Sequence, residues 1–104
     1  MKTKAERDLE LANKPIMIHG YKLVRTCYAC PEQYDVFADG EMVAYFRLRH
    51  GSFRVDVPDC GGQTIYTARP EGDGIFSYEE RVHFLTEAIL AVQKFYLNFS
   101  PEIL

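Results

Sequence analysis

Residues 39–57 read DGEMVAYFRLRHGSFRVDV, and this stretch decides the fold. It contains two segments of alternating apolar and polar residues, 41–49 and 52–57, each preceded by a dipeptide that ends in glycine. Alternation of this kind sends successive side chains to opposite faces of a β-strand. Asp39-Gly40 also suits a two-residue type I′ turn, in which both residues have positive φ. The stretch therefore predicts consecutive β-hairpins in one antiparallel sheet.

The alternation also assigns each of these residues to one face of the sheet. The apolar face is predicted to carry Met42, Ala44, Phe46, Leu48, Phe53, Val55 and Val57. The opposite face is predicted to carry Tyr45, Arg47, Arg49 and Arg54, with Val43 in phase with them and Lys22 as a candidate neighbour. A shift of one residue in the pairing register would exchange the two faces, so the assignment can be tested residue by residue.

Further strands are expected on both sides of this stretch. Before it come a strand that begins at residues 16–18 and continues through 21–28, with a bend or bulge at 19–20, and a strand over 33–38; after it comes a strand over 63–68. Residues 70–74, Pro-Glu-Gly-Asp-Gly, are predicted to form a polar loop without intrinsic order. Residues 1–14 are expected to be a helical or flexible segment, in which a short helix over 4–13 ends before Pro15.

The C-terminal part predicts one long amphipathic helix over residues 78–97. Ser77 and Glu80 have the spacing of a capping box, which satisfies free amides at a helix start. Apolar residues then recur at helical spacing, at Val82, Leu85, Ile89, Val92 and Tyr96, with Ala88 and Phe95 on the flanks. Such a helix lying on the apolar sheet face gives an α+β fold, an antiparallel β-meander of about five strands packed by one C-terminal helix. The chain, residues 1–104, is expected to be a single domain.

Composition and charge narrow the functional classes. Hydrophobic residues make up 47% and charged residues 26%, a balance typical of a globular protein. The net charge of −3 does not favour long-range attraction to nucleic acid. No apolar run approaches the about 18 residues of a membrane span, and the first residues lack the apolar stretch of a secretory signal. With three cysteines, too few for a secreted disulfide scaffold, the sequence favours the cytoplasm and no membrane.

Cys27, Cys30 and Cys60 are the candidate metal ligands. Cys27 and Cys30 have the spacing of a zinc knuckle, and His50 or His83 would complete a site with Cys60. There is one such pair only, without a glycine near Cys30 for the tight turn, so buried free thiols are favoured and no cofactor is expected. Cys60 is also a candidate nucleophile, but no histidine has a local pattern that ties it to Cys60. We therefore assign no catalytic residue and expect a protein that is not an enzyme.

The face with Tyr45, Arg47, Arg49 and Arg54 is the candidate binding site. Arginine and tyrosine dominate protein–protein hot spots, and on a sheet they can also bind single-stranded nucleic acid. The alternative is a solvated face on which Arg47 or Arg49 pairs across strands with Asp56. Because the overall charge is negative, we predict a small non-enzymatic interaction module that binds and modulates a protein partner. A single-stranded nucleic-acid-binding domain and a small zinc-binding or thiol-based protein are the alternatives.

An apolar C-terminal tail bears on self-association. Phe95, Leu97, Phe99, Ile103 and Leu104 are more than one helix face can bury on a single small sheet. The tail either folds back on its own domain or packs against a second copy, and unpaired strand edges offer a further contact. A homodimer is favoured, because two-fold pairing is the commonest way to cover such a surface.

Three strings of the sequence resemble small uncharacterised accessory proteins of bacterial phages and integrative mobile elements. They are YACPEQYDVF at 28–37, RLRHG at 47–51 and FRVD at 53–56, and the resemblance spans residues 20–95. It contains no motif of enzymatic meaning, so it assigns no functional residue. The resemblance implies a setting in which such a protein binds and modulates a host or rival protein, including one of a defence system.

Overall fold

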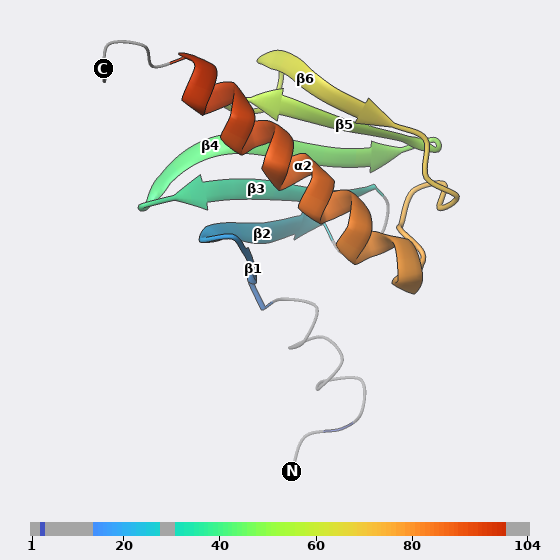
Figure 1. Ribbon diagram of the computed structural model, residues 1–104. Helices are drawn as coiled ribbons and strands as arrows, with labels where there is room; N and C mark the ends of the chain where they lie inside the picture. Colours follow the sequence, from blue (N-terminus) through green and yellow to red (C-terminus); the bar gives the residue numbers. More distant parts are fainter. Residues whose placement is uncertain (1–2, 4–13, 28–30, 100–104) are drawn as a thin grey trace.

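The computed structural model describes Thr3, residues 14–27 and residues 31–99, which form six strands and one helix (Figure 1). The strands make one sheet in the order β1-β2-β3-β4-β5-β6, each antiparallel to the next. The predicted α+β meander with a C-terminal helix is thereby confirmed, and the helix predicted over 4–13 lies outside the described residues. The elements are β1 (Ile16–Ile18), β2 (Tyr21–Cys27), β3 (Glu32–Ala38), β4 (Glu41–Arg49), β5 (Ser52–Val57), β6 (Gln63–Ala68) and α2 (Tyr78–Phe99).

Three hairpins of the meander turn on a dipeptide that ends in glycine. Asp39-Gly40 has φ values of 52° and 81°, so both residues adopt the positive φ that the sequence predicts. His50-Gly51 and His19-Gly20 show the same pattern, with φ of 53° and 72° and of 49° and 84°. The twist of such turns matches the right-handed twist of the flanking strands, which explains why each strand folds back directly onto its neighbour. The bend expected at His19-Gly20 is therefore a complete hairpin.

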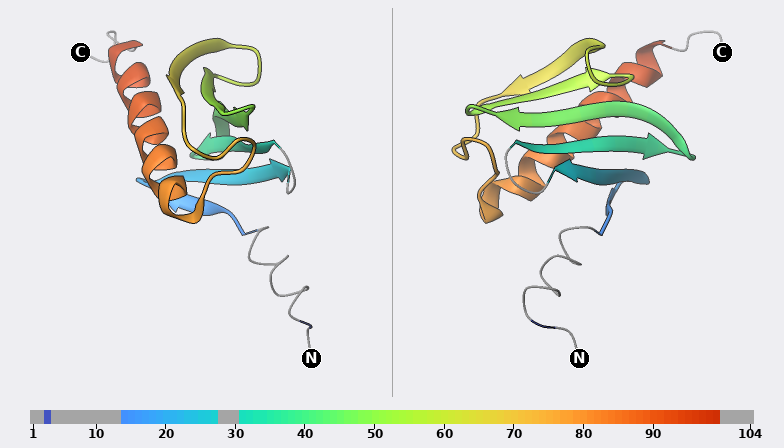
Figure 2. Two further views of the ribbon diagram at one scale, coloured as in Figure 1. Left: turned by 90° about the vertical axis from the view of Figure 1, so that its right-hand side faces the viewer. Right: turned by 180° about the vertical axis from the view of Figure 1, so that it is seen from behind.

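Helix α2 crosses one face of the sheet diagonally (Figure 1). Seen from behind, the opposite face has no helix or strand of the described residues lying over it (Figure 2). No helix among those residues is both long and apolar enough to cross a membrane. The described residues thus form two layers, a sheet and a helix, and leave one sheet face without a covering element.

The core lies between α2 and the predicted apolar face of the sheet. Phe53 of β5 stands at its centre, with its ring edge-on to those of Phe46, Phe76 and Tyr66 at centroid distances of 5.8, 5.0 and 6.1 Å. Edge-to-face aromatic pairs add about 0.5–1.5 kcal/mol to the effect of burial. The sheet contributes buried side chains from Ala44, Phe46, Leu48, Phe53, Val55 and Val57, as predicted, and the helix contributes Leu85, Ala88, Ile89 and Val92.

The prediction that Met42 belongs to this core is wrong. The register between β3 and β4 shifts at Val36/Phe37, so that Ala44 faces Val36 but Met42 faces Phe37. A β-bulge of this kind adds one residue to one strand and changes the side-chain phase beyond it. Val43 therefore packs against the core in place of Met42, and its carbonyl accepts a hydrogen bond from the Tyr96 hydroxyl at 2.7 Å.

Val82 was also predicted on the buried side of the helix, but its side chain is 69% exposed. The position one turn before Leu85 on the core side of α2 belongs to Arg81, whose guanidinium turns toward the sheet. Val82 lies to one side of that stripe. The helical period was right, and the N-terminal end of the apolar face was placed one residue too far along.

The loop 70–74 differs most from its expectation, because tertiary hydrogen bonds order it. The amides of Glu71 and Gly72 donate to the Glu80 carboxylate at 2.9 and 2.8 Å. The carbonyls of Asp73 and Gly74 accept from the amides of Gly51 at 2.6 Å and Glu32 at 2.7 Å. Composition alone indicated a loop, but the partners that fix this loop lie in three other elements.

Candidate functional site on the outer sheet face

Arg47, Arg49 and Arg54 gather on the open face of the sheet, as the alternation predicts. Arg47 of β4 and Arg54 of β5 are direct cross-strand partners, and Arg49 is the partner of Ser52. With His50 of the intervening turn, these side chains line a surface depression of about 300 Å³. The structure thus brings three of the four predicted binding residues together around one hollow.

Asp56 pairs with Arg54, rather than with Arg47 or Arg49 as the solvated-face interpretation expected. Asp56 is buried, and its Oδ1 lies 3.2 Å from Arg54 Nε. This contact is an ion pair without hydrogen-bond geometry, since Arg54 Nε has no hydrogen-bond acceptor. The Asp56 carboxylate also accepts from Thr64 Oγ1 at 2.7 Å and from the amide of Gly61 at 3.2 Å. Asp56 therefore anchors Arg54 and the β5–β6 loop together.

Arg47 and Arg49 have no such counterion in the part of the chain that the structure describes. Like charges placed directly opposite on neighbouring strands are destabilising, and Arg47 faces Arg54 in this way. Local positive charge is therefore concentrated here although the chain as a whole carries −3. An external anionic group would relieve this repulsion.

Tyr45 lies on the outer face, but the prediction that it offers an exposed contact is wrong. Its side chain is 7% exposed, and its hydroxyl donates a 2.8 Å hydrogen bond to Gln33 Oε1. Burial raises the pKa of the Tyr45 hydroxyl, and the nearby Cys60 thiol adds to this, whereas Arg47 lowers it. Tyr45 is therefore a buried side chain beside Arg47, hydrogen-bonded to the cross-strand partner of Arg47.

Two of the three candidate metal ligands, Cys27 and Cys60, lie in the described residues. Cys27 is a half-buried free thiol at the end of β2, Cys60 is an exposed free thiol in the β5–β6 loop, and Cys30 lies outside the described residues. In the described ranges, no group of three histidine, cysteine or acidic side chains is placed to hold a metal ion. A zinc site that includes Cys30 stays a prediction.

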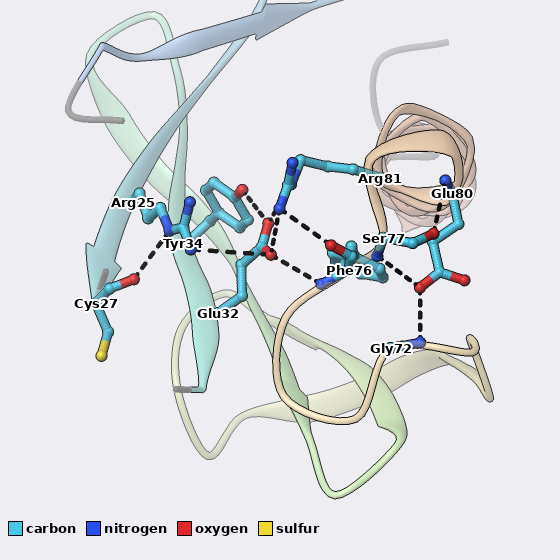
Figure 3. Close-up of polar contacts among 9 residues, drawn as sticks. All are labelled: Arg25, Cys27, Glu32, Tyr34, Gly72, Phe76, Ser77, Glu80 and Arg81. Carbon is cyan, nitrogen blue, oxygen red and sulfur yellow. Dashed lines mark hydrogen bonds and ion pairs between the residues drawn. The ribbon is translucent and has the colours of Figure 1, made fainter. Parts of the chain in front are cut away.

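A buried polar network that sequence reasoning missed holds the start of α2 against the sheet (Figure 3). Its centre is Glu32, which is 1% exposed. The Glu32 carboxylate accepts from the Tyr34 hydroxyl at 2.5 Å, the Phe76 amide at 3.0 Å, and Arg81 Nε and Nη2 at 2.8 and 3.1 Å. Arg25 Nη2 lies 3.9 Å from the same carboxylate. The network connects β2, β3, the β6–α2 loop and the first turns of α2.

The electrostatics of this network favour an ionised Glu32. Burial acts to raise the pKa of the Glu32 carboxyl, but the hydrogen bonds from Arg81 and Tyr34 and the charge of Arg81 outweigh it and lower that pKa. Burial and the adjacent carboxylate raise the pKa of the Tyr34 hydroxyl, and the hydrogen bonds to Glu32 raise that of Arg81. Every strong acceptor of the carboxylate has a donor, which is the condition under which a buried charge is tolerated. The network is therefore a structural clamp.

A signal for this clamp was present in the sequence. Glu32 alternates in phase with Tyr34 and Val36 on the core face of β3. Arg81 precedes Leu85 by one turn on the core side of α2. A charged residue in phase with core residues on each of two elements indicates a buried pair, because an unpaired buried charge is too costly.

Comparison of the chain with protein-family models, with curated proteins and with solved structures finds no match. A function for this chain is therefore inferred from the geometry of its own residues.

Proposed function

We propose that this chain is a small non-enzymatic interaction module that binds and modulates a protein partner through the outer sheet face around Arg47, Arg49 and Arg54. The main observation in support is that Arg47 and Arg49 line a hollow on a sheet face that no described element covers. Neither arginine has a counterion among the described residues. Arginine is enriched at interface hot spots because its planar guanidinium makes several directed hydrogen bonds. The clamp at Glu32 and the packed core give this face a rigid support.

The resemblance to accessory proteins of phages and mobile elements supports a biological setting for this proposal. The resemblance implies that such a protein binds a protein of the host or of a rival element, including a protein of a defence system. We propose that this chain acts in the cytoplasm of a bacterial cell in the same manner.

The test is quantitative recovery of partners from a bacterial lysate with the wild-type chain and two charge-matched double variants. Arg47→Ala/Arg49→Ala removes two charges from the hollow, whereas Arg69→Ala/Lys94→Ala removes two from exposed positions after β6 and on α2. We expect a protein that is recovered by the wild type and the control variant and lost with Arg47→Ala/Arg49→Ala, confirmed by binding of the purified pair. Equal recovery by all three chains would contradict the proposal.

The alternative function of this face is the binding of single-stranded nucleic acid. Stacking of bases on a sheet needs exposed aromatic rings, and Tyr45, the aromatic residue assigned to that role, is buried. The net charge of −3 adds a long-range repulsion. Fluorescence anisotropy with oligo-dT and oligo-U at low salt separates the two functions, and affinity that falls steeply with salt would favour nucleic acid.

We further propose that a second copy pairs along β6. This edge strand contains no charged residue and no proline, and Gln63, Thr64 and Thr67 are exposed. Natural edge strands are usually protected by such residues, and the other edge, β1, is only three residues long. Of the apolar tail, Leu97 is exposed, and residues 103 and 104 lie outside the described ranges. Light scattering should give twice 12.0 kDa for the wild type and 12.0 kDa for Thr67→Lys, and a wild-type mass of 12.0 kDa at every concentration would contradict the dimer.

A further inference from the structure

We propose that the hollow lined by Arg47, Arg49, His50, Ser52 and Arg54 binds a phosphate monoester, presented as a phosphorylated side chain of the protein partner. This inference rests on the proposed function and names the chemistry of the group that is recognised. The hollow measures about 300 Å³, at the lower end of the about 300–1,000 Å³ typical of ligand pockets. It has room for a phosphate group and part of the side chain that carries it.

The first argument is the balance of charge. Three guanidinium groups line the hollow, and the Asp56 carboxylate, paired with Arg54, offsets one of them. Two positive charges remain without a counterion among the described residues. A phosphate monoester carries about −1.5 to −2 at neutral pH, which matches this excess, whereas one carboxylate would leave it half compensated.

The second argument is the arrangement of hydrogen-bond donors. Arg47 and Arg54 are cross-strand partners, as are Arg49 and Ser52. Side chains of directly opposed residues start about 4.5–5.5 Å apart, so two guanidinium groups can reach oxygens of one phosphate from opposite strands. Guanidinium groups bind phosphate through paired N–H donors, and the Ser52 hydroxyl supplies a further donor. Arg clusters of this kind are a recurrent mode of recognising phosphorylated motifs.

The third argument is that the hollow is held in place before any ligand arrives. The ion pair with buried Asp56 holds Arg54, and the Tyr45–Gln33 hydrogen bond fixes two side chains beside Arg47, one of them that of its cross-strand partner Gln33. The turn at His50-Gly51 is fixed by the hydrogen bond from the Gly51 amide to the Asp73 carbonyl at 2.6 Å. Preorganised donors lose less conformational entropy on binding, which favours affinity.

The experiment is an NMR titration of the full chain with phenyl phosphate, a monoester, and in parallel with benzoate, inorganic phosphate and oligo-dT. We expect saturable amide shifts over residues 47–54 with phenyl phosphate, and an affinity at least tenfold higher than for benzoate. Arg47→Gln/Arg49→Gln should weaken phenyl phosphate binding at least tenfold, and Arg69→Gln/Lys94→Gln should leave it unchanged. A fluorescent phosphopeptide pool that binds more tightly than inorganic phosphate identifies a phosphoprotein as the source of the group.

Three results would overturn the inference. The first is the absence of saturable shifts at residues 47–54, and the second is equal affinity for benzoate and phenyl phosphate. The third is preferential binding of oligo-dT, which would assign the hollow to phosphodiesters of nucleic acid. If any of these occurs while Arg47→Ala/Arg49→Ala still abolishes partner recovery, the phosphate assignment fails and the proposed function stands. If Arg47→Gln/Arg49→Gln keeps phenyl phosphate binding and Arg47→Ala/Arg49→Ala keeps partner recovery, both the phosphate assignment and the proposed function fail.

Discussion

Glu32 and Arg81, separated by 49 positions in the sequence, form a two-pronged ion pair, with Arg81 Nε 2.8 Å from Glu32 Oε2 and Nη2 3.1 Å from Oε1. This pair connects the first residue of β3 with the first turns of α2, and together with the Tyr96–Val43 hydrogen bond it joins the two layers through polar contacts. Its energetic role follows from the complete burial of Glu32.

Arg81→Met should destabilise the chain by about 3 kcal/mol. Removing one partner of a buried ion pair costs about 3–5 kcal/mol, because the other charge stays buried. We expect the lower end, since the Arg81 side chain is 26% exposed and water can reach the site. Urea unfolding measures the loss. The double variant Glu32→Leu/Arg81→Met should be more stable than Arg81→Met alone, and a double variant that is less stable would contradict the buried-charge explanation.

The same pair predicts a dependence of stability on pH. The pKa of Glu32 is lowered in the folded chain from its ordinary value of 4.5, so the ionised carboxylate stabilises the fold above that value. As pH falls from 4.5 toward the lowered pKa, this contribution is lost. The free energy of unfolding, followed by urea melts from pH 7 to pH 3, should therefore fall more steeply for the wild type than for Glu32→Gln. Parallel curves for the two chains would show that Glu32 does not contribute to acid unfolding.

Phe46→Ala should cost about 3–5 kcal/mol, whereas Arg47→Ala should change stability by less than about 0.5 kcal/mol. The two residues are neighbours in β4, but Phe46 is fully buried under α2 and Arg47 lies on the open face. Urea melts of both variants test the assignment of faces. Equal losses would mean that the arginine face is part of the packing and is not available to a partner.

Val92→Ala and Val82→Ala form a matched pair on the helix. Val92 is fully buried, and its truncation should cost about 1.5–3 kcal/mol, while exposed Val82 should tolerate the change with less than about 0.5 kcal/mol. Thermal unfolding followed by circular dichroism compares the two directly. A large loss at Val82 would indicate that this side chain is covered in solution.

Glu80→Ala should loosen the loop that precedes α2. Besides the capping-box bond from the Ser77 amide at 2.9 Å, the Glu80 carboxylate accepts the amides of Glu71 and Gly72. Loss of a helix cap costs about 0.5–2 kcal/mol. Hydrogen exchange should become faster at the Glu71 and Gly72 amides than in the wild type, with the β4 amides as an internal control. Unchanged exchange at both amides would contradict the role of Glu80.

The sequence was sufficient for those features that depend on local pattern. The alternation of β4 from Ala44 to Arg49, the Asp39-Gly40 turn and the Ser77/Glu80 cap each depend on residues close together in the chain, and all three are present as predicted. The errors arise where distant segments meet. The bulge at Val36/Phe37 depends on how β3 pairs with β4, and no local pattern indicates which residue is extra.

The candidate site divides in the same way. Alternation placed Arg47, Arg49 and Arg54 on one face, because phase along a strand is a local property. The burial of Tyr45 was not predicted, since its hydrogen-bond partner Gln33 lies on the neighbouring strand, 12 positions away in the sequence. Periodicity can indicate that Glu32 and Arg81 are each on a core face, but it does not report the contacts that the Glu32 carboxylate makes across 44 to 49 positions.

Alternate positions of β4 are subject to two different physical constraints. In β4, residues 44, 46 and 48 lie in the core, and residues 47 and 49 line the hollow. Substitutions at positions 47 and 49 can therefore change the charge of the hollow without altering the volume of the core. Under the proposed function, the specificity of this face for a partner can change while the fold stays the same.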